Sequence, residues 1–531
     1  MSTPNPQGVQ GVQGTERPHV LVLMADQYRW DCLSIAGEAG LLPQGASLPK
    51  TPNLDRLAHD GVWFPKAFCP LPVCTPSRYS LLSGLYVHQH GGWTNRCTLT
   101  PEIETFPKAL RRAGYGTHAV GKMHLTPTYL DVGFDTMELA EQNGPGRYED
   151  DYHRELMAAG LVPSSDLIDQ EREWREGAPA AYRETFGAER SNLPEEWHST
   201  TWIGDRAVRA IDRWTETFSQ QEQRGQQEQE RPPGRPQLLM ASFVKPHHPF
   251  DPPAPWDALY DPDALTPLPG WTDEAPADDL TYNAGYFPHE SLTEAALRRV
   301  MAHYYATITQ LDHQIGRMLA ALDRQGLYER TMIVFTADHG EYLGYHHLLL
   351  KGGQMYEPLI RVPLIVKPAR ATAGPSQVSD VMASTIDVAP TILRGVGLDV
   401  PAGMRGLTLM SAGAARDYVF AENRRGAAYM ARSDRWKLLI DRDAARTRFY
   451  DLVQDPHELR NLATDPAHAE VMRQHRDALA DWMLFESPTP VRLDDAAPVV
   501  TGTGSHQPDQ AREQREALLA FFRQEMARRE S

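Results

Sequence analysis

The chain has 531 residues, enough for about two to four domains of ordinary size or for one large α/β core with an appended unit. Hydrophobic residues make up 41% and charged residues 23%, which excludes disorder, a fibrous repeat or a coiled coil as a description of the whole chain. The formal net charge is −17, and no run of lysine and arginine offsets it, so nucleic acid and anionic membranes are excluded as main partners.

Cysteine content and apolar stretches indicate where the protein acts. The four cysteines are too few for a disulfide framework in a chain of this length, and their spacing matches no zinc motif. Residues 1–18 lack the apolar core of a signal peptide, and no apolar stretch is long enough to span a membrane. We therefore expect a cytoplasmic protein with residues 1–18 as a disordered leader.

Apolar runs alternate with helical patterns through the first three quarters of the chain. Residues 19–25 are continuously apolar, which is typical of a buried parallel strand, and Thr331–Ala337 is a second run of this kind. Residues 116–120 form a shorter one, while residues 51–61 and 105–114 have the start signals and apolar spacing of helices. The sequence therefore predicts an α/β fold with a large, mixed, mostly parallel central sheet flanked by helices, in which ligands bind beyond the carboxyl ends of the strands.

Two further segments differ from this pattern. Residues 220–237 contain almost no apolar side chains, so we expect a solvated insertion loop there. Beyond about Gly406, short strands joined by tight turns replace the alternation, which predicts a smaller antiparallel subdomain closed by a helix near residues 511–529. The expected organisation is a leader (1–18), an α/β catalytic domain (19–406) and a C-terminal α+β subdomain (407–531).

Cys74 stands at the start of a predicted helix, in the run Cys-Thr-Pro-Ser-Arg. The N-terminus of a helix favours anions and lowers the pKa of a thiol, so from position alone a reactive cysteine and an inert capping cysteine are equally expected. The motif is more informative, because Cys-x-Pro-Ser-Arg resembles the signature of the type I sulfatases, in which the cysteine is oxidised to formylglycine (3-oxoalanine). The resemblance implies an aldehyde hydrate as the nucleophile and a formylglycine-generating enzyme as a maturation partner.

Polar pairs follow two of the predicted strands. Asp26 and Gln27 follow the first strand, and Asp338 and His339 follow the late one. Activation of a geminal diol requires a Lewis acid with oxygen-rich ligands, and these four residues match the metal-binding positions of the sulfatases, where the modified Cys74 also contacts the metal. Many sulfatases have a second acidic residue where Gln27 stands and an asparagine where His339 stands. We expect Ca²⁺, with Mn²⁺ as the alternative that the imidazole makes more competitive.

The transferred sulfate is a tetrahedral anion, so its site needs cations around it. The run Gly121-Lys-Met-His-Leu resembles the Gly-Lys-x-His element of the family, which implies that Lys122 contacts the nucleophile and the sulfate and that His124 acts as a base on the diol. The run Lys245-Pro-His-His-Pro-Phe resembles a second family element and indicates His247 rather than His248. Taken singly, a lysine is more often a solvated surface residue and a histidine in such a run a structural turn residue.

Three more residues complete the expected site. The segment from Asp338 to Lys351 resembles the one that leads to a second sulfate-binding lysine, and Lys351 or His247 is expected to assist the leaving alcohol. Arg78, one helical turn beyond Cys74, is expected to orient the diol. Asn95 is expected to contact the substrate.

The resemblance extends over residues 19–463 and implies an alkaline-phosphatase-like fold. It implies a sulfuric ester hydrolase that cleaves a sulfate monoester through a covalent sulfo-enzyme intermediate. The combination of Gln27 with His339 also resembles the phosphonate monoester hydrolases and phosphodiesterases that share the nucleophile, whereas Lys122 with His124 favours the sulfatase. A non-catalytic binding protein on the same fold is the third alternative. The alcohol half of the substrate is left open, as is a homo-oligomer.

Overall fold

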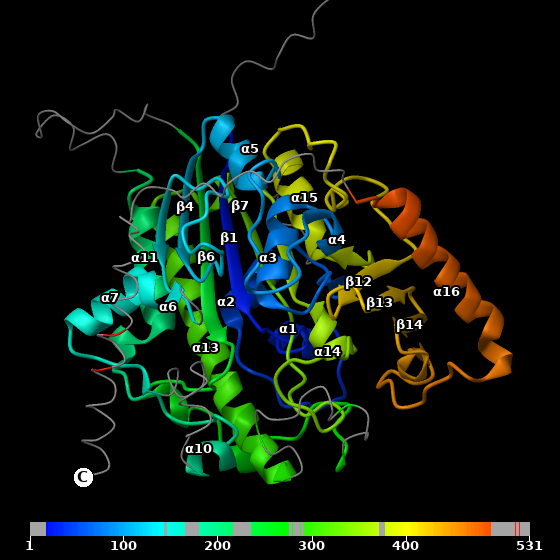
Figure 1. Ribbon diagram of the computed structural model, residues 1–531. Helices are drawn as coiled ribbons and strands as arrows, with labels where there is room; N and C mark the ends of the chain where they lie inside the picture. The colour runs from blue at the N-terminus through cyan, green and yellow to red at the C-terminus, as the bar shows by residue number, and fades with distance from the viewer. Residues whose placement is uncertain are drawn as a thin grey trace, which may run out of the picture.

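The computed structural model describes residues 17–142, 146–164, 180–215, 235–274, 279, 287, 291–370, 377–489, 516 and 520. Its centre is an eight-stranded sheet in the order β10-β2-β9-β7-β1-β6-β4-β5 (Figure 1). The strands of this sheet are β1 (His19–Asp26), β2 (Val62–Trp63), β4 (Gly116–Gly121), β5 (Thr136–Leu139), β6 (Gln237–Pro246), β7 (Thr331–Ala337), β9 (Leu364–Lys367) and β10 (Gln377–Val378). A small sheet beside it contains β3 (Ala67–Phe68), β8 (Arg361–Val362) and β11 (Ala383–Ser384).

The central sheet is mixed but mostly parallel. Strand β1 runs parallel to both of its neighbours, β6 and β7, and the β6-β4-β5 half is parallel throughout. Strand β9 is antiparallel to β7 and to β2. The predicted fold class is therefore confirmed, and the two strands predicted most clearly from their apolar runs, β1 and β7, lie side by side in the middle.

Helices cover both faces of the sheet (Figure 1). One group contains α2, α11 and α13, in which α11 and α13 contact β6; the other contains α3, α5 and α15, in which α5 contacts β4 and α15 contacts β7. The helix bounds are α1 (Ser34–Glu38), α2 (Pro52–His59), α3 (Cys74–Ser83), α4 (Val87–His90), α5 (Phe106–Arg112), α6 (Gly146–Glu149), α7 (Asp151–Ala158), α10 (Ala180–Glu184), α11 (Ser199–Asp212), α13 (Glu294–Arg324), α14 (Glu357–Ile360), α15 (Val388–Gly395) and α16 (Ala469–Asp481).

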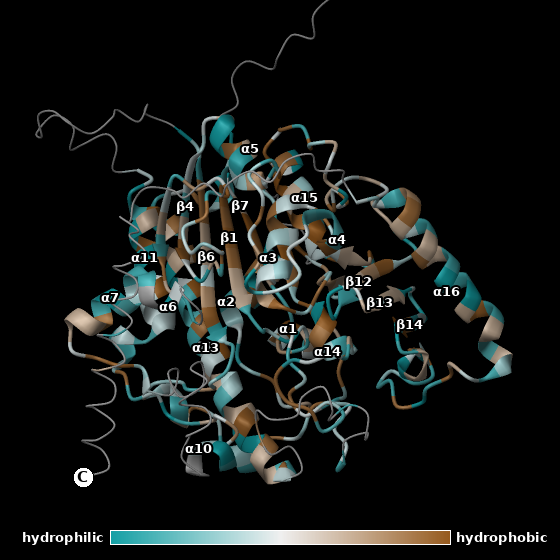
Figure 2. Cartoon of the chain, viewed as in Figure 1, coloured by the Kyte–Doolittle hydropathy of each residue, from teal (hydrophilic) through white to brown (hydrophobic). Residues whose placement is uncertain are grey.

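Burial on both faces explains why the central strands are continuously apolar rather than alternating. Six consecutive residues of β1, from Val20 to Ala25, are 0% exposed. In Figure 2, apolar residues are concentrated on the strands, and hydrophilic residues lie on the outer sides of the helices. A strand covered by helices on both sides must present apolar side chains in both directions, which is typical of parallel α/β sheets.

The C-terminal part contains an antiparallel sheet in the order β12-β13-β14-β15, as predicted. Its strands are β12 (Val419–Asn423), β13 (Ala428–Arg432), β14 (Trp436–Asp441) and β15 (Arg448–Asp451), and helix α16 contacts β13 and β14. The sequence patterns gave no prediction of α16. The helix predicted near 511–529 lies almost wholly outside the described residues, as do most of the leader and of the 220–237 loop, and the division into domains stays a prediction. In the part of the chain that is described, no helix is both long and apolar enough to cross a membrane.

His19, at the start of β1, provides a test of the packing at the base of the sheet. Its ring stacks on Trp214 with centroids 4.9 Å apart. Its Nδ1 accepts a hydrogen bond of 3.2 Å from the backbone N–H of Gln237. Burial, together with the positive charge of Arg330, lowers the pKa of His19 to about 4. The folded state therefore holds a neutral imidazole where the unfolded chain takes up a proton below about pH 6.5.

We predict that His19→Asn, which retains an acceptor for Gln237, makes the protein less sensitive to mild acid. Because the folded pKa is the lower one, the wild type loses stability as the pH falls from about 6.5 to about 4, and this loss reaches about 2 kcal/mol at pH 5. Thermal melting at pH 7.5 and pH 5 measures the effect. Equal losses in melting temperature for the wild type and the variant would show that His19 does not contribute to the acid sensitivity.

Candidate active site

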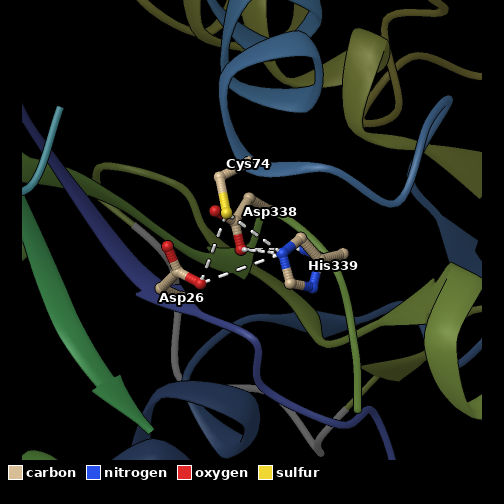
Figure 3. A group of neighbouring side chains, drawn as sticks. All are labelled: Asp26, Cys74, Asp338 and His339. Atoms are coloured by element: carbon tan, nitrogen blue, oxygen red, sulfur yellow. Dashed lines mark hydrogen bonds and ion pairs between the residues drawn. The ribbon is translucent and has the colours of Figure 1, made fainter. Parts of the chain in front are cut away.

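The candidate site lies where the carboxyl ends of β1 and β7 meet the first turn of α3. Asp26 is the last residue of β1, and Asp338 and His339 directly follow β7, its parallel neighbour. Helix α3 begins at Cys74 and ends at Gly84, which has φ 66° and adopts the left-handed conformation that terminates helices. The sheet and the helix therefore bring these residues together from three distant parts of the sequence (Figure 3).

Four of the five predicted metal-binding residues form one buried group. One ligand atom from each of Asp26, Cys74, Asp338 and His339 lies within 4.8 Å of the others, and all four residues are 0% exposed. The Sγ atom of Cys74 lies 3.3 Å from His339 Nε2 and 3.8 Å from Asp26 Oδ1. Figure 3 shows the four side chains pointing toward one another.

Gln27, the fifth predicted ligand, offers a free oxygen beside this group. Its backbone N–H donates to Asp338 Oδ1 at 3.1 Å, and its side-chain Nε2 donates to Glu341. The amide oxygen, Oε1, is buried and has no hydrogen-bond partner among the described residues. A buried carbonyl oxygen without a partner is unfavourable unless a ligand completes it. Two carboxylates, this oxygen and the imidazole nitrogen of His339 together make a donor set that fits a divalent cation.

Predicted cationic residues border the carboxylates. Arg78 donates from Nε to Asp338 Oδ2 at 2.9 Å and from Nη2 to Asp26 Oδ2 at 3.2 Å, and Lys122 Nζ lies 2.5 Å from the same Asp26 oxygen. Lys122 reaches this position because Gly121 turns the chain with φ 92°, where a Cβ atom would lie 2.1 Å from the backbone oxygen of Ser242. Only glycine fits at that turn, which explains the Gly-Lys order of the motif.

Lys351 comes from the loop after β7 and contacts Cys74 directly. Its Nζ atom lies 3.1 Å from Cys74 Sγ and 3.0 Å from His247 Nε2. Burial alone would raise the pKa of the Cys74 thiol, but Lys351, Lys122 and His339 outweigh it and hold that pKa well below its ordinary value. The surroundings therefore favour an anionic group at position 74.

The two carboxylates differ in their titration. Burial and Cys74 act to raise the pKa of Asp26, but the cations Lys122, His247 and Arg78 prevail and lower it. Burial and the charge of Asp26 raise the pKa of Asp338. Asp26 is therefore the carboxylate that stays ionised most readily.

The adjacent histidines point to different neighbours. Their rings stack with centroids 4.1 Å apart, while His248 Nδ1 lies 3.4 Å from Gln27 Nε2. Burial and the nearby charge of Lys351 hold the pKa of His247 well below its ordinary value. Lys351 Nζ lies 3.0 Å from His247 Nε2, while His247 Nδ1 lies 2.7 Å from the backbone oxygen of His248 and 2.5 Å from Gln142 Nε2. Of the two adjacent histidines, His247 is the one that contacts Lys351, whose Nζ atom in turn contacts Cys74.

His124 and Asn95 contact Thr75 in the first turn of α3. The backbone oxygen of His124 accepts a hydrogen bond from Thr75 Oγ1 at 2.8 Å, and Asn95 Oδ1 accepts one from the Thr75 backbone N–H at 3.1 Å. His124 has φ 53°, and its Nδ1 is buried with no hydrogen-bond partner within the described ranges. Every predicted site residue is therefore in or next to the cluster around Cys74.

The segment after β5 supplies two residues that the sequence patterns did not indicate. Gln142 Oε1 accepts from Lys122 Nζ at 2.7 Å, and its Nε2 donates to the backbone oxygen of His248 at 2.6 Å. Glu141 Oε1 accepts from the backbone N–H groups of Met123 and His124, at 2.9 and 2.8 Å. Their only signal in the sequence is a polar pair after a short apolar run, the signal that identified Asp26 and Gln27.

Comparison with known proteins agrees with this arrangement. The sulfatase family model matches residues 18–398, and a model named N-sulphoglucosamine sulphohydrolase, C-terminal, matches residues 344–483. The arylsulfatase of Clostridium perfringens is 29% identical over 488 residues, covering 86% of this chain and 92% of its own length. The multifunctional alkaline phosphatase superfamily protein PehA of Trinickia caryophylli is 29% identical over 524 residues, covering 88% and 95%.

The fold is also that of solved structures. The phosphonate monoester hydrolase of Agrobacterium radiobacter superposes with a TM-score of 0.68 at 24% identity, over 91% of this chain and 99% of that one. The family model covers well over half of the chain, and the strand-end cluster around Cys74 lies within the matched residues. The chain is a hydrolase that belongs to the sulfatase family.

Proposed function

We propose that this sulfatase cleaves sulfate monoesters with a formylglycine that is made from Cys74 by a formylglycine-generating enzyme. The observation that carries the proposal is the positive charge around residue 74. Lys351, Lys122 and His339 stabilise a negative charge on its side chain. An aldehyde hydrate has a second hydroxyl that serine and cysteine lack. We propose that one hydroxyl attacks the sulfur atom, giving a covalent sulfate ester, and that the other provides the route for releasing it.

A divalent cation fits beside this side chain, held by Asp26, Gln27, Asp338, His339 and residue 74. When bound, it would lower the pKa of a coordinated hydroxyl and stabilise charge on the sulfate oxygens. Oxygen ligands predominate, which favours Ca²⁺, while the nitrogen of His339 makes Mn²⁺ the alternative.

Lysines and histidines of the chain would bind the sulfate and move the protons. Lys122 and Lys351 lie beside Asp26 and Cys74, where they would neutralise the oxygens of the transferred group. Because His247 Nε2 accepts from Lys351, we assign to Lys351 Nζ the proton that reaches the leaving alcohol. We assign to His124 the removal of the proton from the remaining hydroxyl, since its Nδ1 is buried and free.

Two other residues would keep these groups in position. Arg78 bridges Asp26 and Asp338 and so fixes both carboxylates. Asn95 holds the backbone N–H of Thr75 at the start of α3 and would also contact the substrate.

All four cysteines are free, which supports a reducing, cytoplasmic location.

A phosphonate monoester or phosphate diester hydrolase is the second candidate function. It is favoured by Gln27 and His339, which reduce the negative charge of the donor set, and by the likeness to a phosphonate monoester hydrolase structure. We predict a higher kcat/KM for 4-nitrophenyl sulfate than for 4-nitrophenyl phenylphosphonate, measured on one preparation with its formylglycine content determined. The opposite order of kcat/KM would make the second candidate the main activity.

A further inference from the structure

Arg147, in the short helix α6, is a buried arginine with one unpaired edge. The residue is 0% exposed, and its Nη1 donates to the backbone oxygen of Gln142 at 3.0 Å. Its Nε and Nη2 are buried too, and neither has a hydrogen-bond partner in the part of the chain that the structure describes. Within the described ranges, no carboxylate forms an ion pair with Arg147.

A buried guanidinium without a counter-charge is unfavourable, because the group stays protonated in proteins and a buried charge needs an opposite charge beside it. Nε and Nη2 lie on the same edge of the planar group, so their N–H bonds run side by side. That edge matches two oxygens of one carboxylate, sulfate or phosphate group. The third nitrogen, Nη1, is fixed by the Gln142 backbone oxygen, which holds the edge in a set orientation. Arg147 is thus prepared for an oxyanion that the described protein residues do not provide.

Gln142 connects this edge to the candidate active site. Its backbone oxygen accepts from Arg147, and its side chain accepts from Lys122 Nζ at 2.7 Å and donates to the backbone oxygen of His248. The guanidinium and the sulfate-binding lysine therefore lie on two sides of a single residue. Lys122 is already paired with Asp26, whereas none of the described carboxylates pairs with Arg147.

We propose that Arg147 binds a second anionic group of the substrate, so that the preferred substrates are sulfate esters whose alcohol half carries a carboxylate or a further sulfate. The inference rests on the proposed sulfate site and adds the chemistry of the alcohol half. It also gives the strongly acidic chain a local means of holding a doubly charged substrate, since the net charge of −17 opposes its approach.

Binding of two non-reactive ligand types tests the proposal without turnover. Benzenesulfonate carries one anion, and 3- and 4-sulfobenzoate carry the same sulfonate with a carboxylate. By calorimetry, we expect the wild type to bind at least one sulfobenzoate about tenfold or more tightly than benzenesulfonate, as a charge-assisted pair in a buried site would give. Arg147→Gln should lose this preference and retain the affinity for benzenesulfonate within about threefold. Arg112→Gln, at an exposed arginine paired with Glu104, is the matched control and should retain it.

Each other outcome of the binding experiment overturns the proposal. Equal affinity of the wild type for benzenesulfonate and both sulfobenzoates would show that Arg147 does not bind a second anionic group. Equal weakening of both ligand types in Arg147→Gln would show that Arg147 acts only by holding Gln142. Binding of benzoate at Arg147 without any gain from linking it to the sulfonate would indicate a separate anion site. Failure of benzenesulfonate to bind the wild type would overturn the proposed sulfate site together with this inference.

A stability measurement distinguishes the ligand-binding role from a structural one. Without ligand, Arg147→Met removes an unpaired buried charge, so its melting temperature should equal or exceed that of the wild type. The binding assay on the same variant should show the loss of preference seen for Arg147→Gln. A fall in melting temperature of more than about 3 °C would show that Arg147 is required for the fold, and would contradict the unpaired edge.

Discussion

Replacing Cys74 by serine is expected to stop turnover while the protein folds normally. The side chain is wholly buried at the first turn of α3, and serine is close to cysteine in size, so the packing is preserved. A serine hydroxyl can accept one sulfate group but has no second hydroxyl with which to release it. Steady-state release of 4-nitrophenol should therefore fall by at least about 10³-fold, and mass spectrometry should show a stable adduct of about 80 Da.

Cys97→Ser is the control for this experiment, because Cys97 is only half-buried and lies outside the cluster around Cys74. Its activity should equal that of the wild type. Sustained multiple turnover by Cys74→Ser would contradict the proposed aldehyde mechanism, since that mechanism needs both hydroxyls. The melting curve of Cys74→Ser shows whether the variant is folded. We expect it to retain the melting temperature of the wild type.

Lys351→Ala is expected to have the second largest effect. Its Nζ atom contacts both Cys74 Sγ and His247 Nε2. In the proposed mechanism, charge develops there on the transferred group and on the leaving oxygen. Removing a positioned electrostatic donor from a buried site lowers kcat/KM by about 10²-fold or more. The effect should be largest for substrates with poor leaving groups, because those depend most on proton donation.

Lys50→Ala serves as the matched control, since Lys50 is exposed and its described contact is made by the backbone N–H to Tyr260. We expect no change in kcat/KM for this variant. An unchanged kcat/KM in Lys351→Ala would show that the contacts of Lys351 have no catalytic consequence. An equal loss for good and poor leaving groups would remove the assignment of the proton donor and leave only charge stabilisation.

The fold was predictable where local sequence reflects burial. Strands β1 and β7 are continuously apolar because helices cover both faces, and the strand-end rule then places Asp26 beside Asp338. Helix α16 was missed because it is strongly polar and only a few of its residues are buried, so its apolar pattern is weak. The antiparallel C-terminal sheet was recognised from its turns.

The candidate site was predictable to the extent that each residue stands in a motif or directly after a strand. Arg147 satisfies neither condition, and Gln142 has only the signal of a polar pair after a short apolar run. Their importance lies in contacts made across the sheet to Lys122 and across one turn to each other. Such contacts depend on β4, β5 and β6 lying side by side, which the sequence of any one strand does not specify. A motif search therefore finds the groups that react and misses the groups that hold them.

Mass spectrometry of the peptide that carries Cys74 tests the central claim most directly. The protein is produced together with a formylglycine-generating enzyme, and the mass of the peptide is compared with that calculated for cysteine. The account predicts a loss of about 18 Da, the conversion of the thiol to an aldehyde. An unmodified thiol, in a preparation where a control substrate of the same maturation enzyme is converted, would contradict the proposed nucleophile.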